Sequence, residues 1–296
     1  MSEQVEAEVP VFFHIPRCAG TYIYENVLCS GLLGQHREEI KVLLKERKSV
    51  KYSKFCRFDL SFDNPLQFPG EISCLASLDL SKMSLPAFES AVSVDHLKEY
   101  LRKDWLKLRG FVINPIVGDF KQKFSLVEDL CQMSAGKPHY FTVLRKSFDW
   151  HRSMFYYLRD VGVWEPTYGC YTGMSFVEYI NSKHMADSWV IRVLTGLSDD
   201  VPITDMQYEE TVKILSTFTI GFFDNMQDFL EVLNKRFRWQ SKSDFKNNRN
   251  ESKASEKLSV GDIPESALKI FNERVKYEMK LYEHFRNANK SPLNKF

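Results

Sequence analysis

One segment of this 296-residue chain, Val11–Leu28, strongly limits what the chain can fold into. A short apolar run ends at Pro16, the small and basic turn RCAGT (17–21) follows, and an amphipathic pattern then begins. A strand that stops abruptly and leads into a helix points the N–H groups of its turn at one spot, where the helix dipole adds partial positive charge. The pattern indicates an α/β protein and fits either an anion-binding turn or an ordinary strand-to-helix turn. It is not a Walker A loop, because no G-x-x-x-x-G-K-[ST] occurs here.

A second strand-to-helix pattern occupies Tyr140–Asp160. Its first residues, Tyr140–Leu144, are mostly aromatic or β-branched, which is typical of a buried strand. Arg145 ends this run, and Ser153 lies further on in the helical pattern that follows. A guanidinium fork and a hydroxyl that converge suit a phosphate monoester. The sequence therefore predicts a second anion-binding position formed by Arg145 and Ser153.

Together the two segments resemble one protein family. HIPRCAGT resembles the 5′-phosphosulfate loop of the sulfotransferases, commonly HIPK-T-G/A-G-T in their carbohydrate branch. TVLRKSFDWHRS is similar to their 3′-phosphate element, T-V-L-R-D-P-x-x-R-x-x-S. Weaker similarities follow in the same order at Trp189–Gly196, Thr219–Leu233 and Ile263–Tyr282. From residue 11 to residue 285 the chain resembles a sulfotransferase of the carbohydrate branch, of the heparan-sulfate 2-O type.

The chain departs from the family pattern at several positions. Arg17 stands where the family usually has Lys, which keeps the charge but replaces a compact ammonium with a planar fork. Lys146 and Ser147 replace Asp-Pro, and Trp150 replaces an Arg. Because Arg145 and Ser153 are retained, the departures bear more on which acceptor is used than on binding of the donor.

The resemblance implies that the chain binds 3′-phosphoadenosine 5′-phosphosulfate (PAPS), transfers its sulfuryl group to a hydroxyl or amine, and releases 3′-phosphoadenosine 5′-phosphate (PAP). The acceptor is expected to be a carbohydrate or small metabolite, and no metal is required. Arg17 would neutralise charge on the bridging oxygen, and Arg145 and Ser153 would bind the 3′-phosphate. The residues expected to hold the donor are Arg17, Cys18, Ala19, Gly20, Thr21, Tyr22, Arg145, Ser153, Arg249 and Lys253.

The general base is assigned by position. Glycan-directed relatives often have a Gly-His pair after the strand that precedes the 3′-phosphate element, and Gly118-Asp119 stands there in this chain. Asp119 is therefore the expected base, although an ordinary Asp, with a pKa of about 3.9, needs a desolvated site for that role, and a turn residue is the other interpretation. His14 is expected to be structural. His139, His151 and His184 are further possible bases.

Composition supports one large domain and sets limits on partners. Hydrophobic residues make up 44% of the chain, enough for a full core, and the net charge of +1 provides no overall field toward nucleic acid. The six cysteines form no C-x-x-C pair, so free thiols are expected, and Cys18 could be reactive if the N–H groups of its loop lower its pKa.

The expected location of the protein follows from its apolar runs and its first residues. No apolar run is long enough to span a membrane, and the acidic first ten residues do not have the basic and apolar regions of a signal peptide. A cytoplasmic protein is expected, unless a native anchor has been removed. The oligomeric state is left open.

Alternating strands and helices predict a central parallel β-sheet with helices on both faces, as in P-loop-like sulfotransferases. Strands are expected at Val11–Ile15, Tyr52–Phe62, Glu71–Leu80, Phe111–Val117, Tyr140–Leu144 and Phe218–Phe223. Helices are expected at Gly20–Leu32, Glu38–Lys48, Asp95–Leu108, Ser125–Met133, Ser175–Ser182, Asp187–Leu194, Asp205–Ser216, Met226–Phe237 and Glu265–Phe285. Ligands in such sheets bind beyond the carboxyl ends of the strands, where Arg17 and Arg145 are expected.

One domain is expected over residues 11–286, between a disordered segment at 1–10 and a tail at 287–296. Within the domain, residues 60–93 are expected to form an irregular insertion beside the acceptor, and residues 240–261 a loop that covers the donor.

Two other functions fit the same patterns. One is a protein that binds PAPS or PAP without catalysis, because Arg17 and the missing His depart from the family. The other is a P-loop-like nucleotide kinase, which the missing Lys-Ser/Thr disfavours, because that hydroxyl holds Mg²⁺ during phosphoryl transfer.

Overall fold

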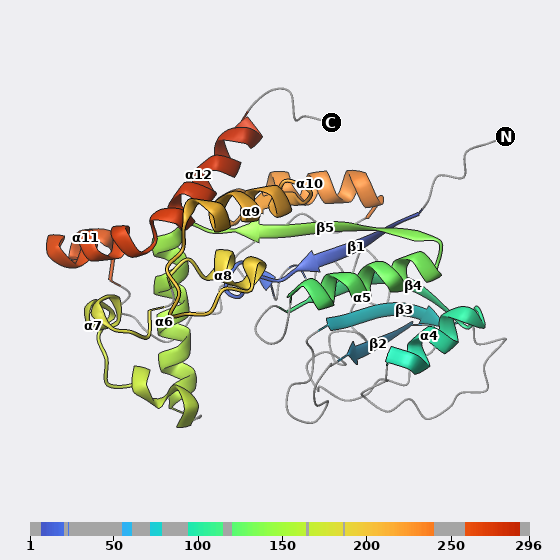
Figure 1. The fold of residues 1–296 in the computed structure, drawn as a ribbon, viewed down its shortest axis with the longest axis horizontal. Coiled ribbons are helices and arrows are strands. Elements are labelled where there is room, and N and C mark those ends of the chain that lie inside the picture. The colour runs from blue at the N-terminus through green and yellow to red at the C-terminus, as the bar shows by residue number, and fades with distance from the viewer. Residues whose placement is uncertain are drawn as a thin grey trace.

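The computed structural model describes residues 7–20, 23, 55–60, 72–78, 94–114, 120–163, 166–185, 187–239 and 258–290. These residues form an α/β fold around a six-stranded sheet with the strand order β2-β3-β4-β1-β5-β6 (Figure 1). The strands are β1 (Ala7–Phe13), β2 (Phe55–Leu60), β3 (Ile72–Leu78), β4 (Leu106–Ile113), β5 (Gly136–Leu144) and β6 (Thr219–Phe222).

The sheet is mostly parallel rather than wholly parallel. β4, β1, β5 and β6 run in the same direction, as the sequence predicts. β3 pairs antiparallel with β4, and β2 pairs antiparallel with β3, so the expectation of a fully parallel sheet is wrong at this edge. An antiparallel pair needs no helical crossover, and only residues 61–71 join β2 to β3. β3 lies within the strand expected at Glu71–Leu80, so this part of the stretch 60–93 is regular.

Helices flank this sheet (Figure 1). The α-helices are α4 (Val94–Arg102), α5 (Phe120–Met133), α6 (Ser147–Gly162), α7 (Phe176–Asn181), α8 (Trp189–Thr195), α9 (Asp205–Leu215), α10 (Met226–Phe237), α11 (Glu265–Arg274) and α12 (Lys276–Lys290). Short 3₁₀ turns are η3 (Pro166–Tyr171), η4 (Phe223–Asn225) and η5 (Val260–Asp262).

The two faces of the sheet are covered by different helices. Successive side chains of a strand point to opposite faces. Phe13 of β1 packs edge-on against Phe120 of α5, at 5.2 Å between ring centroids. Its neighbour Phe12 stacks on Phe141 of β5, which in turn contacts Phe229 of α10. α5 and α10 therefore lie on opposite faces, and the predicted layering of helices on both sides is confirmed.

The helix expected at Asp95–Leu108 is too long. α4 ends at Arg102, and Asp104 adopts a left-handed conformation with φ of 54°. β4 then begins at Leu106, earlier than the strand expected from Phe111, because Leu106 is buried and Lys107 is exposed in the alternation of a strand.

The ends of the fold also differ from expectation. β1 begins at Ala7, where it pairs with Gly136, so residues 7–10 belong to the sheet rather than to a disordered segment. At the other end α12 continues to Lys290, into the expected tail. The single helix expected at Glu265–Phe285 is divided at Val275 into α11 and α12.

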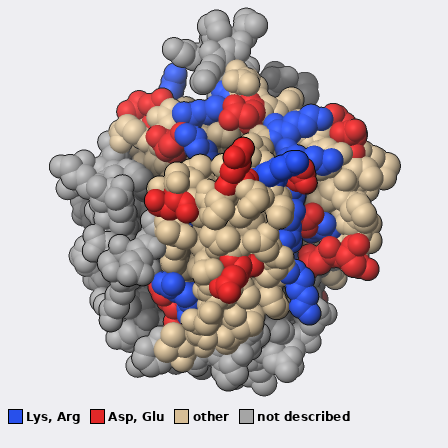
Figure 2. All heavy atoms as spheres, turned by 90° about the vertical axis from the view of Figure 1, so that its left-hand side faces the viewer, with Lys and Arg blue, Asp and Glu red and all other residues tan. Residues whose placement is uncertain are grey.

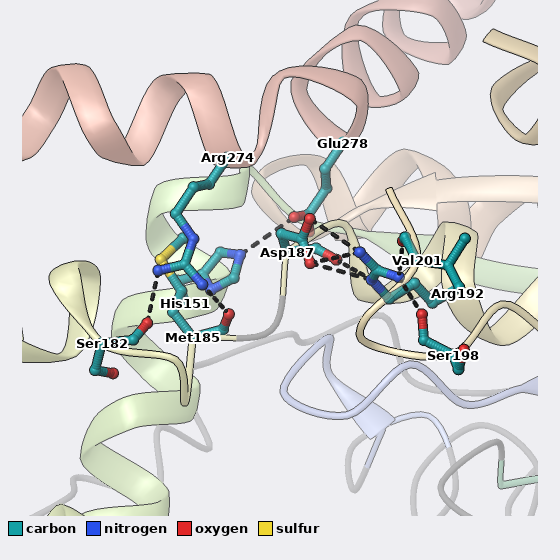
Figure 3. Close-up of polar contacts among 9 residues, drawn as sticks. All are labelled: His151, Ser182, Met185, Asp187, Arg192, Ser198, Val201, Arg274 and Glu278. Carbon is teal, nitrogen blue, oxygen red and sulfur yellow. Dashed lines mark hydrogen bonds and ion pairs between the residues drawn. The ribbon is translucent and has the colours of Figure 1, made fainter. Parts of the chain in front are cut away.

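Arg274, the last residue of α11, holds the end of α7 and the connection that follows it. Its Nη1 donates to the carbonyl of Ile180 at 2.9 Å and to that of Ser182 at 2.7 Å. Its Nη2 donates to the carbonyl of Met185 at 2.6 Å (Figure 3). One guanidinium thus satisfies three carbonyls for which no helix or strand provides a donor.

Two further polar contacts lie beside Arg274 (Figure 3). His151 of α6 is fully buried, and its Nε2 lies 3.2 Å from Oε2 of Glu278 in α12. Arg192 of α8 pairs with Asp187 at 2.9 Å and donates to the carbonyl of Val201 at 2.8 Å. The first contact joins α6 to α12, and the Arg192 contacts hold together the segment from Asp187 to Val201.

Charges of both signs are mixed on the face that carries α7 and α11. Figure 2 shows Lys and Arg next to Asp and Glu along its edges, around a central area with little charge. This face therefore presents no large field of one sign. Among the helices in the described ranges, none combines the length and apolarity needed to cross a bilayer.

Gly221 of β6 allows α10 to approach the sheet closely. A Cβ at this position would lie 2.3 Å from Cγ of Phe229. We expect Gly221→Ala to lower the free energy of unfolding in urea by about 1–3 kcal/mol, the usual cost of overpacking a core. Gly173→Ala is the control, because nothing lies within 4 Å of a Cβ there. Equal effects of the two substitutions would contradict this account of the packing.

Candidate functional site

The candidate site lies at the carboxyl end of β1, where the strand order changes direction. β1 has β4 on one side and β5 on the other, both parallel to it. The chain reaches β5 from β4 through α5 and so passes over β1. Such switch points are where open α/β sheets bind ligands, because the loops after neighbouring strands separate there. The loop His14–Gly20 follows β1 at this point, and Arg145 follows β5.

The loop has an unusual backbone. Arg17 and Ala19 both lie in the left-handed region, with φ of 62° and 59°. This conformation costs a residue with a side chain about 1–2 kcal/mol. Left-handed residues within a turn direct successive N–H groups toward a common concave side, which is a geometry that binds anions. Ile23 N–H then donates to the carbonyl of Ala19 at 2.9 Å, a helical contact.

His14 supports the loop from beneath. Its Nδ1 donates to Oδ1 of Asn114, the residue after β4, at 2.9 Å. Its Nε2 lies so close to Gly20 that a Cβ there would be 1.7 Å away, so only glycine fits. Burial lowers the pKa of His14, although the hydrogen bond that it donates to Asn114 opposes this shift. His14 is thus a neutral, hydrogen-bonded ring under the loop, in line with the structural role expected for it.

The loop is tied to β5 and α6 by three hydrogen bonds. Nε1 of Trp150 donates to the carbonyl of Pro16 at 2.8 Å. Nη1 of Arg145 donates to the carbonyl of Arg17 at 2.9 Å. Nε of Arg17 donates to Oγ of Ser153 at 3.1 Å. The structure thus brings Arg17, Arg145 and Ser153 together, but the hydroxyl of Ser153 bonds to Arg17 rather than converging with Arg145 alone.

The two arginines carry charge that the described carboxylates balance only in part, through Asp160 near Arg17 and Asp149 near Arg145. Burial lowers the pKa of both Arg17 and Arg145. Within the described ranges neither guanidinium forms an ion pair with a carboxylate, and each lies over a ring instead: Arg17 over Tyr157 at 4.8 Å and Arg145 over Phe223 at 4.2 Å. Nε of Arg145 is buried and has no hydrogen-bond partner. Desolvated cations without full counter-charge favour the binding of an anion.

Cys18 is not the reactive thiol that its loop suggests. Its side chain is 1% exposed, and burial raises its pKa to about 12, against the opposing effect of Arg145. It lines a small cavity behind the loop, together with Arg145, Trp150 and Glu278. With about 20 Å³ the cavity has room for about one water molecule. A nucleotide would have to lie on the outer side of the loop.

Other histidines proposed as bases have different surroundings. His139 pairs with Pro10 in the first half of β1, away from the carboxyl ends, and donates or accepts at Oγ1 of Thr219 at 2.8 Å. Burial lowers its pKa to about 4. Nε2 of His151 is already in a hydrogen bond with Oε2 of Glu278, at 3.2 Å. The carbonyl of His184 accepts a hydrogen bond from the hydroxyl of Tyr171 at 3.4 Å.

The remaining expected site residues lie outside the described residues: Thr21, Tyr22, Asp119, Arg249 and Lys253. The structure adds three residues that the sequence did not assign to the site: Trp150, Tyr157 and Phe223. Trp150 and Tyr157 could have been found from helical spacing, because they lie three residues before and four residues after Ser153 on α6. No group of three or more His, Cys, Asp or Glu side chains in the described ranges is arranged to hold a metal ion.

Fold and site together define an α/β protein whose mostly parallel sheet brings two arginines together at its switch point, one in the loop after β1 and one after β5. Comparison of the chain with protein-family models, curated proteins and solved structures gives no match. The functional argument therefore depends on the geometry of the site.

The contact between Gly20 and His14 can be tested by paired substitutions. Gly20→Ala should lower the free energy of unfolding, because the new Cβ would collide with the His14 ring. His14→Ala removes that ring, so the double variant should be more stable than the sum of the single effects, by about 1 kcal/mol or more. Urea unfolding of the four proteins measures this coupling. Additive effects would show that the ring and Gly20 do not meet.

The thiols of Cys18 and Cys170 should differ in reactivity. At pH 8, iodoacetamide should modify the exposed Cys170 and leave Cys18 unmodified until the protein is unfolded, because Cys18 is buried and its raised pKa keeps it protonated. Mass spectrometry of peptides from native and urea-treated protein checks this. Rapid alkylation of Cys18 in the native state would contradict the burial described above.

Proposed function

We propose that this chain is a PAPS-dependent sulfotransferase that transfers the sulfuryl group to a hydroxyl or amine of a carbohydrate or small metabolite. The observation that carries the proposal is the pair of half-buried arginines, Arg17 and Arg145, which form no ion pair with a carboxylate in the described ranges. They belong to the two segments that resemble the 5′-phosphosulfate loop and the 3′-phosphate element. One ligand with two separate anionic groups explains both.

In the proposed reaction the acceptor oxygen or nitrogen forms a bond to sulfur while the bond from sulfur to the bridging oxygen breaks. The electron pair of the breaking bond remains on the 5′-phosphate of PAP. The N–H groups of the loop hold the phosphosulfate, and Arg17 neutralises the charge that develops on the bridging oxygen. Such a preorganised donor typically contributes about 3–4 kcal/mol to transition-state stabilisation. The proton of the acceptor passes to a base, for which Asp119 is the proposed residue.

Recognition of the 3′-phosphate is assigned to Arg145. Nη1 of Arg145 is already bonded to the loop carbonyl, and its face rests on Phe223. Its Nη2 makes no hydrogen bond with described residues and can donate to a phosphate oxygen. Arg145 would then connect the two ends of the donor, because the same side chain shapes the loop that holds the phosphosulfate. This arrangement distinguishes PAPS from ATP, which lacks a 3′-phosphate.

The first experiment is a thermal-shift comparison followed by a transfer assay. PAP without metal should raise the melting temperature, and ATP with Mg²⁺ should not. The appearance of labelled sulfate from PAPS on an acceptor would then establish catalysis, whereas binding of PAP without transfer to any carbohydrate or small hydroxyl compound would indicate a non-catalytic binding protein. Stabilisation by ATP with Mg²⁺ alone would favour a kinase and overturn the proposal.

Arg145→Ala gives the matching prediction. We expect it to weaken PAP binding about 10-fold or more, the value of a hydrogen bond to a charged group. Binding of adenosine 5′-phosphosulfate should weaken less, because that ligand loses only the support that Arg145 gives to the loop carbonyl of Arg17. Lys146→Ala is the matched control, because this exposed neighbour lies 4.0 Å from Asp224. Isothermal titration calorimetry measures both ligands. Equal losses for the two nucleotides would remove Arg145 from the 3′-phosphate.

A further inference from the structure

We propose that Tyr157 of α6 is a positioning residue for Arg17, which it holds by a cation–π contact so that the two terminal nitrogens of the guanidinium face the anionic group of the ligand. The proposal rests on the proposed function, because it assigns the residue that aims the main cation of the same site. Tyr157 itself makes no contact with the reacting atoms in this account.

Ser153 and Tyr157 contact the side chain of Arg17 at two points. The two residues are one helical turn apart and therefore share a face of α6. Ser153 accepts from Nε at 3.1 Å, and the ring of Tyr157 lies 4.8 Å from the guanidinium carbon. The hydrogen bond fixes one edge of the planar group, and the ring occupies one of its faces. An edge and a face together define how a planar group is oriented.

The opposite edge of the guanidinium remains available. Nη1 and Nη2 of Arg17 form no hydrogen bond and no ion pair with any described residue. Asp160, the next acidic residue on this face of α6, raises the pKa of Arg17 through its charge, but its ion pair in the described ranges is with Arg159, at 3.9 Å. Two parallel N–H donors at a fixed angle match two oxygens of a phosphate or sulfate group. With its Nε edge bonded to Ser153 and one face against Tyr157, the guanidinium presents Nη1 and Nη2 as two donors that can bind an anion together.

The burial of Tyr157 indicates that it is not a core residue. Its side chain is 44% exposed, whereas the adjacent Phe155 and Tyr156 are buried. A half-exposed ring adds little to core packing, so the contact with Arg17 is the main interaction by which it can affect the loop. The contact also suits the change from Lys to Arg in this chain, because a planar guanidinium stacks on a ring better than a compact ammonium does.

The test uses four variants, Tyr157→Leu, Tyr157→Phe, Arg17→Gln and the double variant Arg17→Gln with Tyr157→Leu. Calorimetry measures the binding of inorganic pyrophosphate, a small mimic of the phosphosulfate, and of PAP. Tyr157→Leu should weaken pyrophosphate binding about 3- to 30-fold, the range for a partly desolvated cation–π contact. Tyr157→Phe keeps the ring and should stay within about 2-fold of the original protein. In the Arg17→Gln background the leucine substitution should have less than about 2-fold effect, because no cation remains to be positioned.

Tyr277→Leu is the matched control. Its ring lies 4.9 Å from Nζ of Lys276 on α12, so it removes a similar contact from another part of the molecule and should not change anion binding. Urea unfolding of each variant excludes a general loss of structure.

The positioning role is overturned if Tyr157→Leu binds pyrophosphate as well as the original protein, if Tyr157→Phe loses as much as Tyr157→Leu, or if the loss persists without Arg17. Failure of the original protein to bind any of these anions overturns both proposals. Binding of pyrophosphate that depends on Tyr157, with PAP bound no more tightly, would retain the positioning role and overturn the proposed donor.

Discussion

The attachment of the β1 loop to α6 and to the end of β5 is the interaction on which the rest of the site depends. The loop contains two left-handed residues, which an isolated chain would rarely adopt. Hydrogen bonds from Trp150 and Arg145 to consecutive loop carbonyls hold this backbone in place. The partners lie far apart in the sequence, so the loop has its shape only after β1 and β5 have paired. The loop therefore reaches its binding geometry only when the sheet forms.

Elements that depend on local pattern were predictable from the sequence. The period of an amphipathic helix placed α10 at Met226–Phe237 and placed α9 to within a residue of its end. The direction of β3 and the boundary between α4 and β4 were not predictable. Leu101 and Leu108 fit the spacing of one helix, but Leu108 is buried as part of a strand. The pairing of a strand depends on the whole sheet, so it cannot be read from the local periodicity of apolar residues.

The site was predictable in its charged residues and not in their partners. The ends of two apolar runs correctly placed Arg17 and Arg145 near each other. The bond from Arg17 to Ser153 depends on the left-handed backbone at residue 17, which has no sequence signal because the residue is not glycine. Of the two interpretations left open for Cys18, the inert one holds, and a short loop does not reveal how deeply a thiol is buried. Long-range packing sets these details.

The clasp formed by Arg274 has a consequence for the order in which the protein can mature during synthesis. The carbonyls that it holds belong to the end of α7 and to the connection after it, and the buried His151 finds its acidic partner only in α12. A nascent chain that has emerged only as far as α10 lacks both partners. The carbonyls near α7 and the buried His151 are therefore without these partners until α11 and α12 have been synthesised.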